Sequence, residues 1–231
     1  MGCSSGPDVV EDGLVLCLDA ASKRSYSGSG TTWVDIVGGN DGTLTNGPTF
    51  SSENGGSILL DGTSEYVDFG TSNILNTTTA HTIQFWIKML SMPSNVTPPI
   101  RIKSNSQDLL ILISARSGYQ GVTIGSGGTW AQGKTLTSSD FFLNNWVNIC
   151  VTYNGAGSNT LGNHHIYENL VDKSLTSGTP GLLASTTDTR FGYINSYNYM
   201  NANISNFTIY NRALTADEIR RNYLSTKQRY E

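Results

Sequence analysis

In this 231-residue chain, pairs of carboxylate residues are the first candidates for catalytic chemistry. Hydrolysis of a glycoside needs two carboxyl groups facing one bond, the first as acid and the second as nucleophile or base. The nearest approximations to such a catalytic pair in the predicted strands are Glu65 with Asp68 and Glu168 with Asp172. A separation of three residues puts Glu65 and Asp68 on opposite faces of a regular strand, and a predicted turn separates the other pair. The sequence therefore predicts no glycoside hydrolase.

The histidines lack the spacing of a metal site or of a nucleophile with its base. His164 and His165 are adjacent in a predicted strand, so their rings point to opposite faces, and His81 lies far from both in sequence. No cysteine or carboxylate pair accompanies them at the spacing of zinc ligands. The Gly-x-Ser-x-Gly turn that presents the serine of many hydrolases is also missing. We expect structural or exposed histidines, and we predict no catalytic residue and no metal ligand.

The cysteines are odd in number, and they are Cys3, Cys17 and Cys150. Cys17 and Cys150 stand inside the apolar runs LVLCLD and VNICVTY. Because an unpaired cysteine packs like a small hydrophobic residue, such runs favour burial of the thiol. We predict buried, reduced thiols and no disulfide framework.

Aromatic and amide side chains in the predicted loops suit carbohydrate binding better than catalysis. Aromatic faces meet the C–H surfaces of sugars and amides meet their hydroxyl groups, without any acid or base. The alternative is that these side chains fill loops or contact a neighbouring protein, because Tyr and Trp are also enriched at protein interfaces. We expect Trp86 and Trp146, which lie in predicted strands, to be core residues. The candidate binding residues are Tyr119, Trp130, Tyr197, Asn198 and Tyr199.

The composition indicates short strands joined by polar turns as the elements that position these residues. Only 14% of the residues are charged, 37% are apolar and 25 are glycine, as is typical of strand-and-turn proteins. The net charge of −4 provides no basic surface for phosphate groups, so nucleic acid is not an expected partner. No stretch reaches the ~18 apolar residues of a membrane span, and residues 1–12 have no secretory signal pattern. We expect cytoplasmic synthesis without membrane insertion.

Alternation of apolar and polar residues predicts the strands themselves. In HTIQFWIKML, Ile83, Phe85 and Ile87 occupy every second position, and in WVNICVTYNG Val147 and Ile149 do the same. This period of two puts the apolar side chains of a strand on one face. Roughly a dozen such runs, separated by turn signals, favour a sandwich or a barrel.

Turn and capping signals predict where the strands, the loops and the helix begin and end. SILLDG and EYVDFG flank Gly62 and are predicted to form a hairpin. Residues 91–100 include three prolines and are predicted to be a loop, because proline cannot donate to a ladder. Thr215 followed by Glu218 is a capping box, which predicts one amphipathic helix near the C-terminus. Residues 1–12 lack periodicity and are interpreted as an N-terminal arm, and residues 13–231 as one domain.

Five segments occur in an order that resembles a known family. The segments are GLVLCLDA, SILLDGTSEYVDFG, HTIQFWIK, NNWVNICVTYNG and NISNFTIYNRALTADEIRRNY. This order resembles the laminin-G-like or concanavalin A-like lectin and glucanase family, and especially its branch in phage structural proteins. The resemblance implies an all-β, two-sheet antiparallel jelly-roll sandwich with one short C-terminal helix. The Glu-x-Asp-x-x-Glu triplet of the family's catalytic members is missing.

Calcium is the one cofactor that the resemblance suggests. Members of the family often hold one ion at the rim of the sandwich through Asp side chains and loop carbonyls. Asp61 matches a candidate position, but Ser205 follows Ile204 where an acidic residue often stands in the family. We therefore predict no cofactor, with calcium as the alternative.

These observations together favour a non-enzymatic surface protein of a virus particle. The expected role is capsid decoration or tail association, with other virion proteins and also cell-surface or environmental glycans as partners. The alternative is a carbohydrate-binding module of a bacterial surface or secreted protein. The sequence leaves open which glycan is bound, because a fold alone does not determine function.

Overall fold

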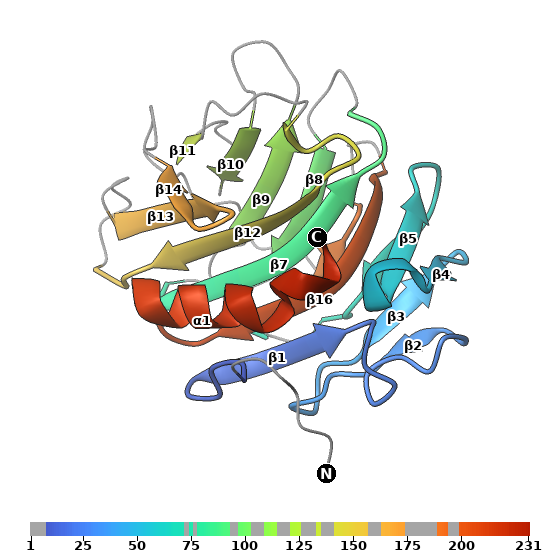
Figure 1. Cartoon of the computed structure of the whole chain (residues 1–231), viewed down its shortest axis with the longest axis horizontal. Helices are drawn as coiled ribbons and strands as arrows, with labels where there is room; N and C mark the ends of the chain where they lie inside the picture. Colours follow the sequence, from blue (N-terminus) through green and yellow to red (C-terminus); the bar gives the residue numbers. More distant parts are fainter. Residues whose placement is uncertain are drawn as a thin grey trace.

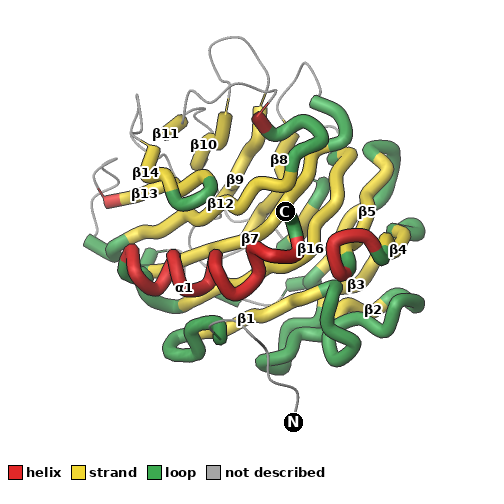
Figure 2. The backbone as a smooth tube through the Cα atoms, viewed as in Figure 1, coloured by secondary structure: helices red, strands yellow, loops and turns green. Residues whose placement is uncertain are grey.

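The protein is a sandwich of two antiparallel β-sheets, as seen in a computed structural model of the chain (Figure 1). The tube view shows that strands are the main secondary structure and that one helix lies across one face of the sandwich (Figure 2). This architecture confirms the predicted all-β jelly-roll class with a C-terminal helix. The residues that the structure describes are 8–71, 74–75, 78–92, 97–102, 109–114, 121–125, 133–134, 141–156, 163–173, 189–193 and 199–231.

The first sheet is built around strands β7 and β16, which pair with each other. Strand β1 pairs with the second half of β16, and β5 pairs with the first half along the same edge. Apart from β1, the strands of this sheet have the order β14-β13-β12-β7-β16-β5-β4. Their bounds are β1 Leu14–Asp19, β4 Thr49–Ser51, β5 Ser57–Asp61, β7 His81–Met89, β12 Trp146–Tyr153, β13 His164–Glu168, β14 Val171–Lys173 and β16 Asn201–Tyr210.

The second sheet has the order β11-β10-β9-β8-β15-β6-β3-β2. Strands β8 to β11 form a meander, in which each strand pairs with the next along the chain. Strand β15 then joins this meander to the N-terminal strands through β6. The bounds are β2 Thr32–Trp33, β3 Gly42–Thr45, β6 Tyr66–Asp68, β8 Thr97–Ile102, β9 Leu109–Ser114, β10 Gly121–Gly125, β11 Gly133–Lys134 and β15 Arg190–Phe191.

The hydrophobic core lies between the sheets and follows the predicted period of two. Ile83, Phe85 and Ile87 of β7 are all buried in one cluster with Val147 and Ile149 of β12. Apolar side chains of the second sheet close the cluster from the other side. Burial of one such side chain is worth about 1.5–3 kcal/mol, so the core dominates the stability of the sandwich.

The two described cysteines confirm the prediction of free, buried thiols. Cys17 on β1 and Cys150 on β12 are both buried and neither forms a disulfide. Burial raises the pKa of the Cys17 thiol to about 12 and raises the pKa of Cys150 as well. Both sulfur atoms therefore act as small apolar groups at neutral pH.

Helix α1, Ala216–Thr226, covers the outer face of the first sheet and is followed by the short helix η4, Lys227–Arg229. The predicted capping box is present, because Thr215 accepts the N–H of Glu218 and Glu218 accepts the N–H of Thr215. Trp86 of β7, which is buried, donates its indole N–H to the hydroxyl of Thr226 at 2.8 Å. A further short helix, η1, spans Glu53–Gly55. In the described part of the chain, no helix has the length and apolar character to cross a membrane.

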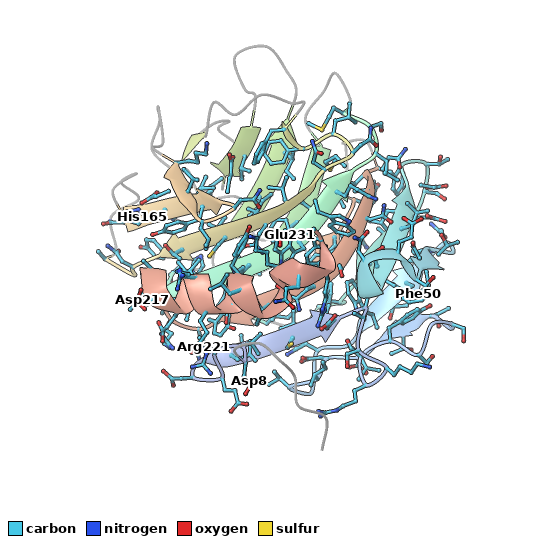
Figure 3. All side chains as sticks on the ribbon, viewed as in Figure 1. Asp8, Phe50, His165, Asp217, Arg221 and Glu231 are labelled. Atoms are coloured by element: carbon cyan, nitrogen blue, oxygen red, sulfur yellow. The ribbon has the colours of Figure 1, made fainter. Side chains whose placement is uncertain are left out.

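The described part of the predicted N-terminal arm, residues 8–12, packs against this helix. Val10 is buried in a second apolar cluster together with Ile219. The N–H of Val10 donates to Asn222 at 2.8 Å, and Arg221 donates to the carbonyl of Asp8 at 2.7 Å, where Figure 3 shows Asp8 and Arg221 next to each other. These contacts attach residues 8–12 to the domain.

The predicted hairpin around Gly62 is wrong, because β5 and β6 belong to different sheets. Gly62 has a φ of +77°, and the carboxylate of Asp61 accepts the N–H of Thr63 at 2.7 Å. The carboxylate of Glu65 accepts the N–H of Asp61 at 2.8 Å, which takes up a donor that a hairpin ladder would use. The chain therefore crosses from one sheet to the other, and this lets both strands bury apolar residues in one core.

The predicted loop over residues 91–100 is also partly wrong, because β8 begins at Thr97 and includes two prolines. The pairing of β8 with β9 shifts register between Thr97 and Ile100. A bulge of this kind leaves residues without ladder partners, so the missing N–H groups of Pro98 and Pro99 cost no hydrogen bond. Proline at a bulge is thus compatible with the strand.

Candidate functional site

The outer face of the second sheet carries polar and aromatic side chains on two neighbouring strands. In β6, Val67 points into the core, so Tyr66 and Asp68 on either side of it point outward. In β15, Phe191 points into the core, so Arg190 points outward. Strands β6 and β15 pair directly, with Arg190 opposite Asp68.

An ion pair joins these two strands at the surface. The Nε of Arg190 lies 3.3 Å from Oδ2 of Asp68, and the side chains are 18% and 24% exposed. The other oxygen of Asp68 accepts the N–H of Gly70 at 2.7 Å. The carboxylate is therefore held by both strand and turn, and it fixes the plane of the guanidinium group.

Three tyrosines surround the guanidinium group of Arg190. The rings of Tyr193 and Tyr199 are stacked, with centroids 4.3 Å apart and planes 11° apart. Tyr66 lies 5.5 Å from Tyr193 and 6.5 Å from Tyr199. The guanidinium carbon of Arg190 is 5.1 Å from the ring centre of Tyr66 and 5.8 Å from that of Tyr193, within cation–π range. We call these four residues, with Asp68, the tyrosine–arginine cluster.

The chain around Gly192 positions the two stacked tyrosines. The carbonyl of Gly192 accepts the N–H of Met200 at 2.9 Å, which brings the ends of segment 193–199 together. Gly192 has a φ of +85°, and a Cβ at this position would collide with Leu60, so glycine alone fits here. Next to it, the ring of Phe191 packs in the core at 4.1 Å from Phe207. A core anchor and a glycine thus fix Tyr193 and Tyr199 at the sheet surface.

The hydroxyl group of Tyr199 remains protonated at neutral pH. Partial burial raises the pKa of Tyr199, and the neighbouring Tyr193 raises it further. A protonated phenol both donates and accepts a hydrogen bond. The cluster therefore combines aromatic surface with hydroxyl, guanidinium and carboxylate groups, all on a half-exposed sheet face, and this set can bind a ligand that has apolar faces and hydroxyl groups.

Tyr199 is the one candidate from the sequence that falls within the described residues, and the structure places it in this cluster. Tyr119, Trp130, Tyr197 and Asn198 lie outside the described residues. Sequence reasoning missed Tyr66, Tyr193, Arg190 and Asp68. The alternation of Tyr66 and Asp68 about Val67 was a signal for a shared outward face, but the sequence did not indicate that β15 is the neighbouring strand.

The carboxylates considered for catalysis make separate contacts. Glu65 accepts the N–H of Asp61, and burial raises the pKa of its carboxyl group. Asp68 pairs with Arg190. Glu168, whose side chain is fully buried, lies 3.6 Å from the ammonium group of Lys173. No two of these carboxylates are joined to each other by a described contact.

Asp61, the calcium candidate, caps a turn in this structure. Its Oδ1 accepts the N–H groups of Thr63 and Ser64 at 2.7 and 3.3 Å, and these bonds lower the pKa of the carboxyl group. Ser205 is buried and donates its hydroxyl to the carbonyl of Gly56 at 2.6 Å. Among the described residues, no group of three or more His, Cys, Asp and Glu side chains is arranged to hold a metal ion.

The sequence profile of the concanavalin A-like lectin/glucanases superfamily matches residues 61–220 of this chain. Those residues include the tyrosine–arginine cluster and most of both sheets. A search of curated proteins gives no match.

Solved structures share the fold at low sequence identity. Trypanosoma rangeli sialidase bound to the inhibitor DANA superposes with a TM-score of 0.69 and 15% identity, over all of this chain and 36% of the sialidase. Domain 4 of the Geobacillus stearothermophilus arabinanase AbnA, bound to arabinotriose, gives 0.67 and 16%, over 96% of this chain and all of that domain. The binding domain of botulinum neurotoxin serotype G gives 0.59 and 17%, over 93% and 51%. The chain spans about a third of the sialidase structures, and these identities show the fold alone.

Proposed function

Because the chain belongs to the concanavalin A-like lectin/glucanases superfamily, we propose that it is a non-enzymatic, glycan-binding domain. The observation that carries this proposal is the tyrosine–arginine cluster on the outer face of the second sheet. The site is a patch on strands β6 and β15, and it includes Tyr193 and Tyr199. A patch of this kind suits a chain-like ligand that lies along the sheet.

The physical argument starts from the chemistry of a sugar ring. A pyranose has one face of C–H groups, which packs on an aromatic ring, and a rim of hydroxyl groups, which needs donors and acceptors. Tyr66 and the stacked pair of Tyr193 and Tyr199 supply aromatic surface. Arg190 supplies donors and Asp68 supplies acceptors, and their ion pair holds both in place before any ligand arrives. Such preorganisation lowers the entropic cost of binding.

The solved relatives support the same class of ligand. Domain 4 of AbnA, which matches this chain over its whole length, is described in complex with arabinotriose. A T. rangeli sialidase structure contains sialic acid. The match covers all of that arabinanase domain, which supports a sugar-binding unit of about the size of this chain.

A non-enzymatic role is supported by the engagement of the candidate carboxylates in other contacts. Glu65 caps the crossover at Asp61, and Asp68 is paired with Arg190. A general acid needs a carboxyl group that faces the scissile bond together with its partner. We propose binding without hydrolysis, and release of reducing ends from an array polysaccharide would overturn this part.

A glycan array probed with the intact protein tests the binding. We expect selective binding by the wild type, and about a tenfold or greater loss of affinity in Tyr66→Ala and Tyr193→Ala. Tyr167→Ala is the matched control, because Tyr167 lies on β13 in the other sheet and is also partly buried. Equal binding by all four proteins would overturn the assignment of the site. Absence of binding to every glycan on the array would overturn the glycan-binding function.

For the biological setting we propose the surface of a virus particle, as a capsid decoration or tail-associated protein bound to other virion proteins. The support is the sequence resemblance of the opening GLVLCLDAASKRSYSGSGTTWVDI and of GTLTNGPTF to phage structural proteins. The alternative setting is a bacterial surface or extracellular protein. Purification of virions distinguishes the two, since a fixed copy number of this chain per particle supports the first, and its absence from particles with recovery from a cell surface supports the second.

A further inference from the structure

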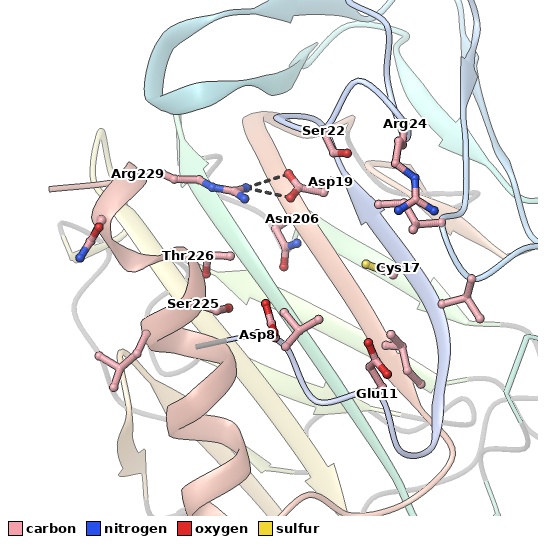
Figure 4. A pocket seen from close by; sticks show the side chains of 16 residues that line it. Asp8, Glu11, Cys17, Asp19, Ser22, Arg24, Asn206, Ser225, Thr226 and Arg229 are labelled. Carbon is pink, nitrogen blue, oxygen red and sulfur yellow. Dashed lines mark hydrogen bonds and ion pairs between the residues drawn. The ribbon is translucent and has the colours of Figure 1, made fainter. Parts of the chain in front are cut away.

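A cleft of about 750 Å³ lies on the other side of the molecule from the tyrosine–arginine cluster. Its walls are strand β1, segment 8–11 and the end of α1 with η4 (Figure 4). This size is within the usual range of small-molecule sites. The cleft lies on the outer face of the first sheet, so it is independent of the site proposed above.

Asn206 of β16 places a buried amide in this cleft. The residue is 7% exposed and lines the cleft. Its side-chain amide takes part in no hydrogen bond within the described part of the chain. Because this amide lines a cleft that opens to solvent, its N–H groups and its oxygen are available to a partner that the protein itself does not supply.

A β-bulge turns this amide into the cleft. The pairing of β16 with β7 shifts register between Ile204 and Phe207, and both of these side chains lie in the core. An even alternation would not put both on the inner face, so the intervening pair, Ser205 and Asn206, is bulged. Bulges re-aim side chains and are frequent beside functional sites. Asn206 is thereby placed opposite Asp19 of β1.

Further hydrogen-bonding capacity surrounds Asn206. Asp19 receives two contacts from Nη1 of Arg229, at 2.8 Å on Oδ1 and 2.9 Å on Oδ2. Oδ1 also accepts the N–H of Ala21, which leaves Oδ2 with capacity for another donor. Ser225 donates its hydroxyl to Asn222 at 2.6 Å, so its oxygen can still accept. Figure 4 shows Asn206 between the Asp19–Arg229 pair and Ser225.

The charges of the cleft favour a neutral ligand. Asp19 and Arg229 neutralise each other inside, and on the rim Asp8 and Glu11 oppose an anion while Arg24 opposes a cation. Apolar side chains, Leu14, Val37 and Leu224 among them, form much of the remaining wall, together with the polar residues Ser22, Thr226 and Gln228. An amide, a carboxylate and a hydroxyl beside apolar wall match a ligand that carries several hydroxyl groups and a C–H face.

We propose that this cleft binds a neutral saccharide of one or two residues, with Asn206 as the residue that recognises its hydroxyl groups. The Asn206 amide donates two hydrogen bonds and accepts others, so it can pair with two adjacent hydroxyl groups of a sugar. Oδ2 of Asp19 and Oγ of Ser225 accept from the same ligand. Binding here does not require the tyrosine–arginine cluster.

The test is NMR titration of the full-length protein with neutral mono- and disaccharides, including glucose, galactose, mannose, arabinose, N-acetylglucosamine, lactose and maltose. We expect at least one sugar to shift the side-chain amide of Asn206 and the backbone amides of Cys17 and Ser225. Asn206→Leu should weaken this binding about tenfold or more. Ser225→Phe, which fills the cleft from the helix and leaves Asn206 in place, should do the same.

Two controls separate this site from the rest of the molecule. Asn203→Leu is matched to Asn206→Leu, because Asn203 lies on the same strand with the same 7% exposure but bonds to Ser57; it should keep sugar binding. Tyr193→Ala should also keep it, even if glycan-array binding is lost. The proposal is overturned if no sugar shifts these amides, or if Asn206→Leu and Ser225→Phe bind like the wild type.

Discussion

His81 makes the stability of this protein sensitive to acid. The residue is 1% exposed at the start of β7, and Tyr153 lies opposite it in the ladder, with His164 on the far side of Tyr153. The ring centres are 5.4 Å apart for His81 and Tyr153, and 4.5 Å apart for Tyr153 and His164. Nδ1 of His81 donates to the carbonyl of Thr79 at 2.8 Å. Among the described residues, Nε2 has no hydrogen-bond partner.

Protonation of His81 would bury a charge whose second N–H has no acceptor. Burial lowers the pKa of His81 from 6.5 to about 4, and the neighbouring His164 contributes to the lowering. The unfolded chain binds a proton below about pH 6.5, whereas the folded protein binds it only below about pH 4. The unfolded state therefore holds more protons between these values, and stability falls as the pH falls through this window.

The expected size follows from the two pKa values. One pKa unit corresponds to about 1.4 kcal/mol, so the whole shift is worth about 3 kcal/mol at acid pH. Between pH 7 and pH 5 the loss from this residue alone is about 2 kcal/mol. Carboxyl groups that titrate near pH 4 also change the free energy of unfolding over this range. The measurement therefore compares the pH dependence of the wild type with that of a His81 variant.

Urea denaturation of wild type and His81→Asn at pH 7 and pH 5, at one ionic strength, tests this. Asn can still donate to the carbonyl of Thr79 but does not titrate, so the variant should lose about 2 kcal/mol less than the wild type over this range. His165→Asn is the control, since the His165 side chain is 50% exposed. An identical pH dependence for His81→Asn and wild type, or an NMR pKa of His81 above 6.5, would refute the reasoning.

Three further predictions concern the helix cap, the turn beside the cluster and a core thiol. Thr215→Ala removes the acceptor of the Glu218 N–H and should lower the free energy of unfolding by about 1 kcal/mol; an unchanged urea midpoint would contradict this. Gly192→Ala should lower the melting temperature more than Gly38→Ala, because both have positive φ but only Gly192 faces a core side chain; equal shifts would contradict it. Cys150, whose thiol pKa is raised by burial, should react with a thiol reagent at about pH 8 only after unfolding, and prompt labelling of Cys150 itself in the native protein, located by peptide mapping, would contradict this.

The strand pattern and the helix cap could be predicted from the sequence because both depend on neighbours in the chain. Alternation places Ile83 and Phe85 on the core face whatever their partners are. The capping box joins Thr215 to Glu218 within one turn, and the structure confirms it. The burial of Cys17 and Cys150 also followed from the apolar runs around them.

The sheet to which a strand belongs could not be predicted in this way. The segment around Gly62 has the composition of a hairpin, and a side-chain bond from Glu65 to the N–H of Asp61 helps direct it across the sandwich. The prolines of β8 are accommodated by a bulge that depends on the pairing with β9. Both outcomes depend on which strands pair in the folded sheets, and the alternation within one strand carries no signal for this.

The sequence predicted many strands and one capped helix, because a period of two and a capping box are local properties, and its resemblance to a known family implied the two-sheet sandwich. It also identified Tyr199 as a binding candidate by residue type. Only the tertiary structure brought Tyr66 beside Arg190, across 124 positions of the chain, because β6 and β15 pair. The same holds for the cleft, where the bulge in β16 turns Asn206 away from the core and into the cleft beside the end of α1. Pairing between distant strands is what converts these scattered polar residues into sites.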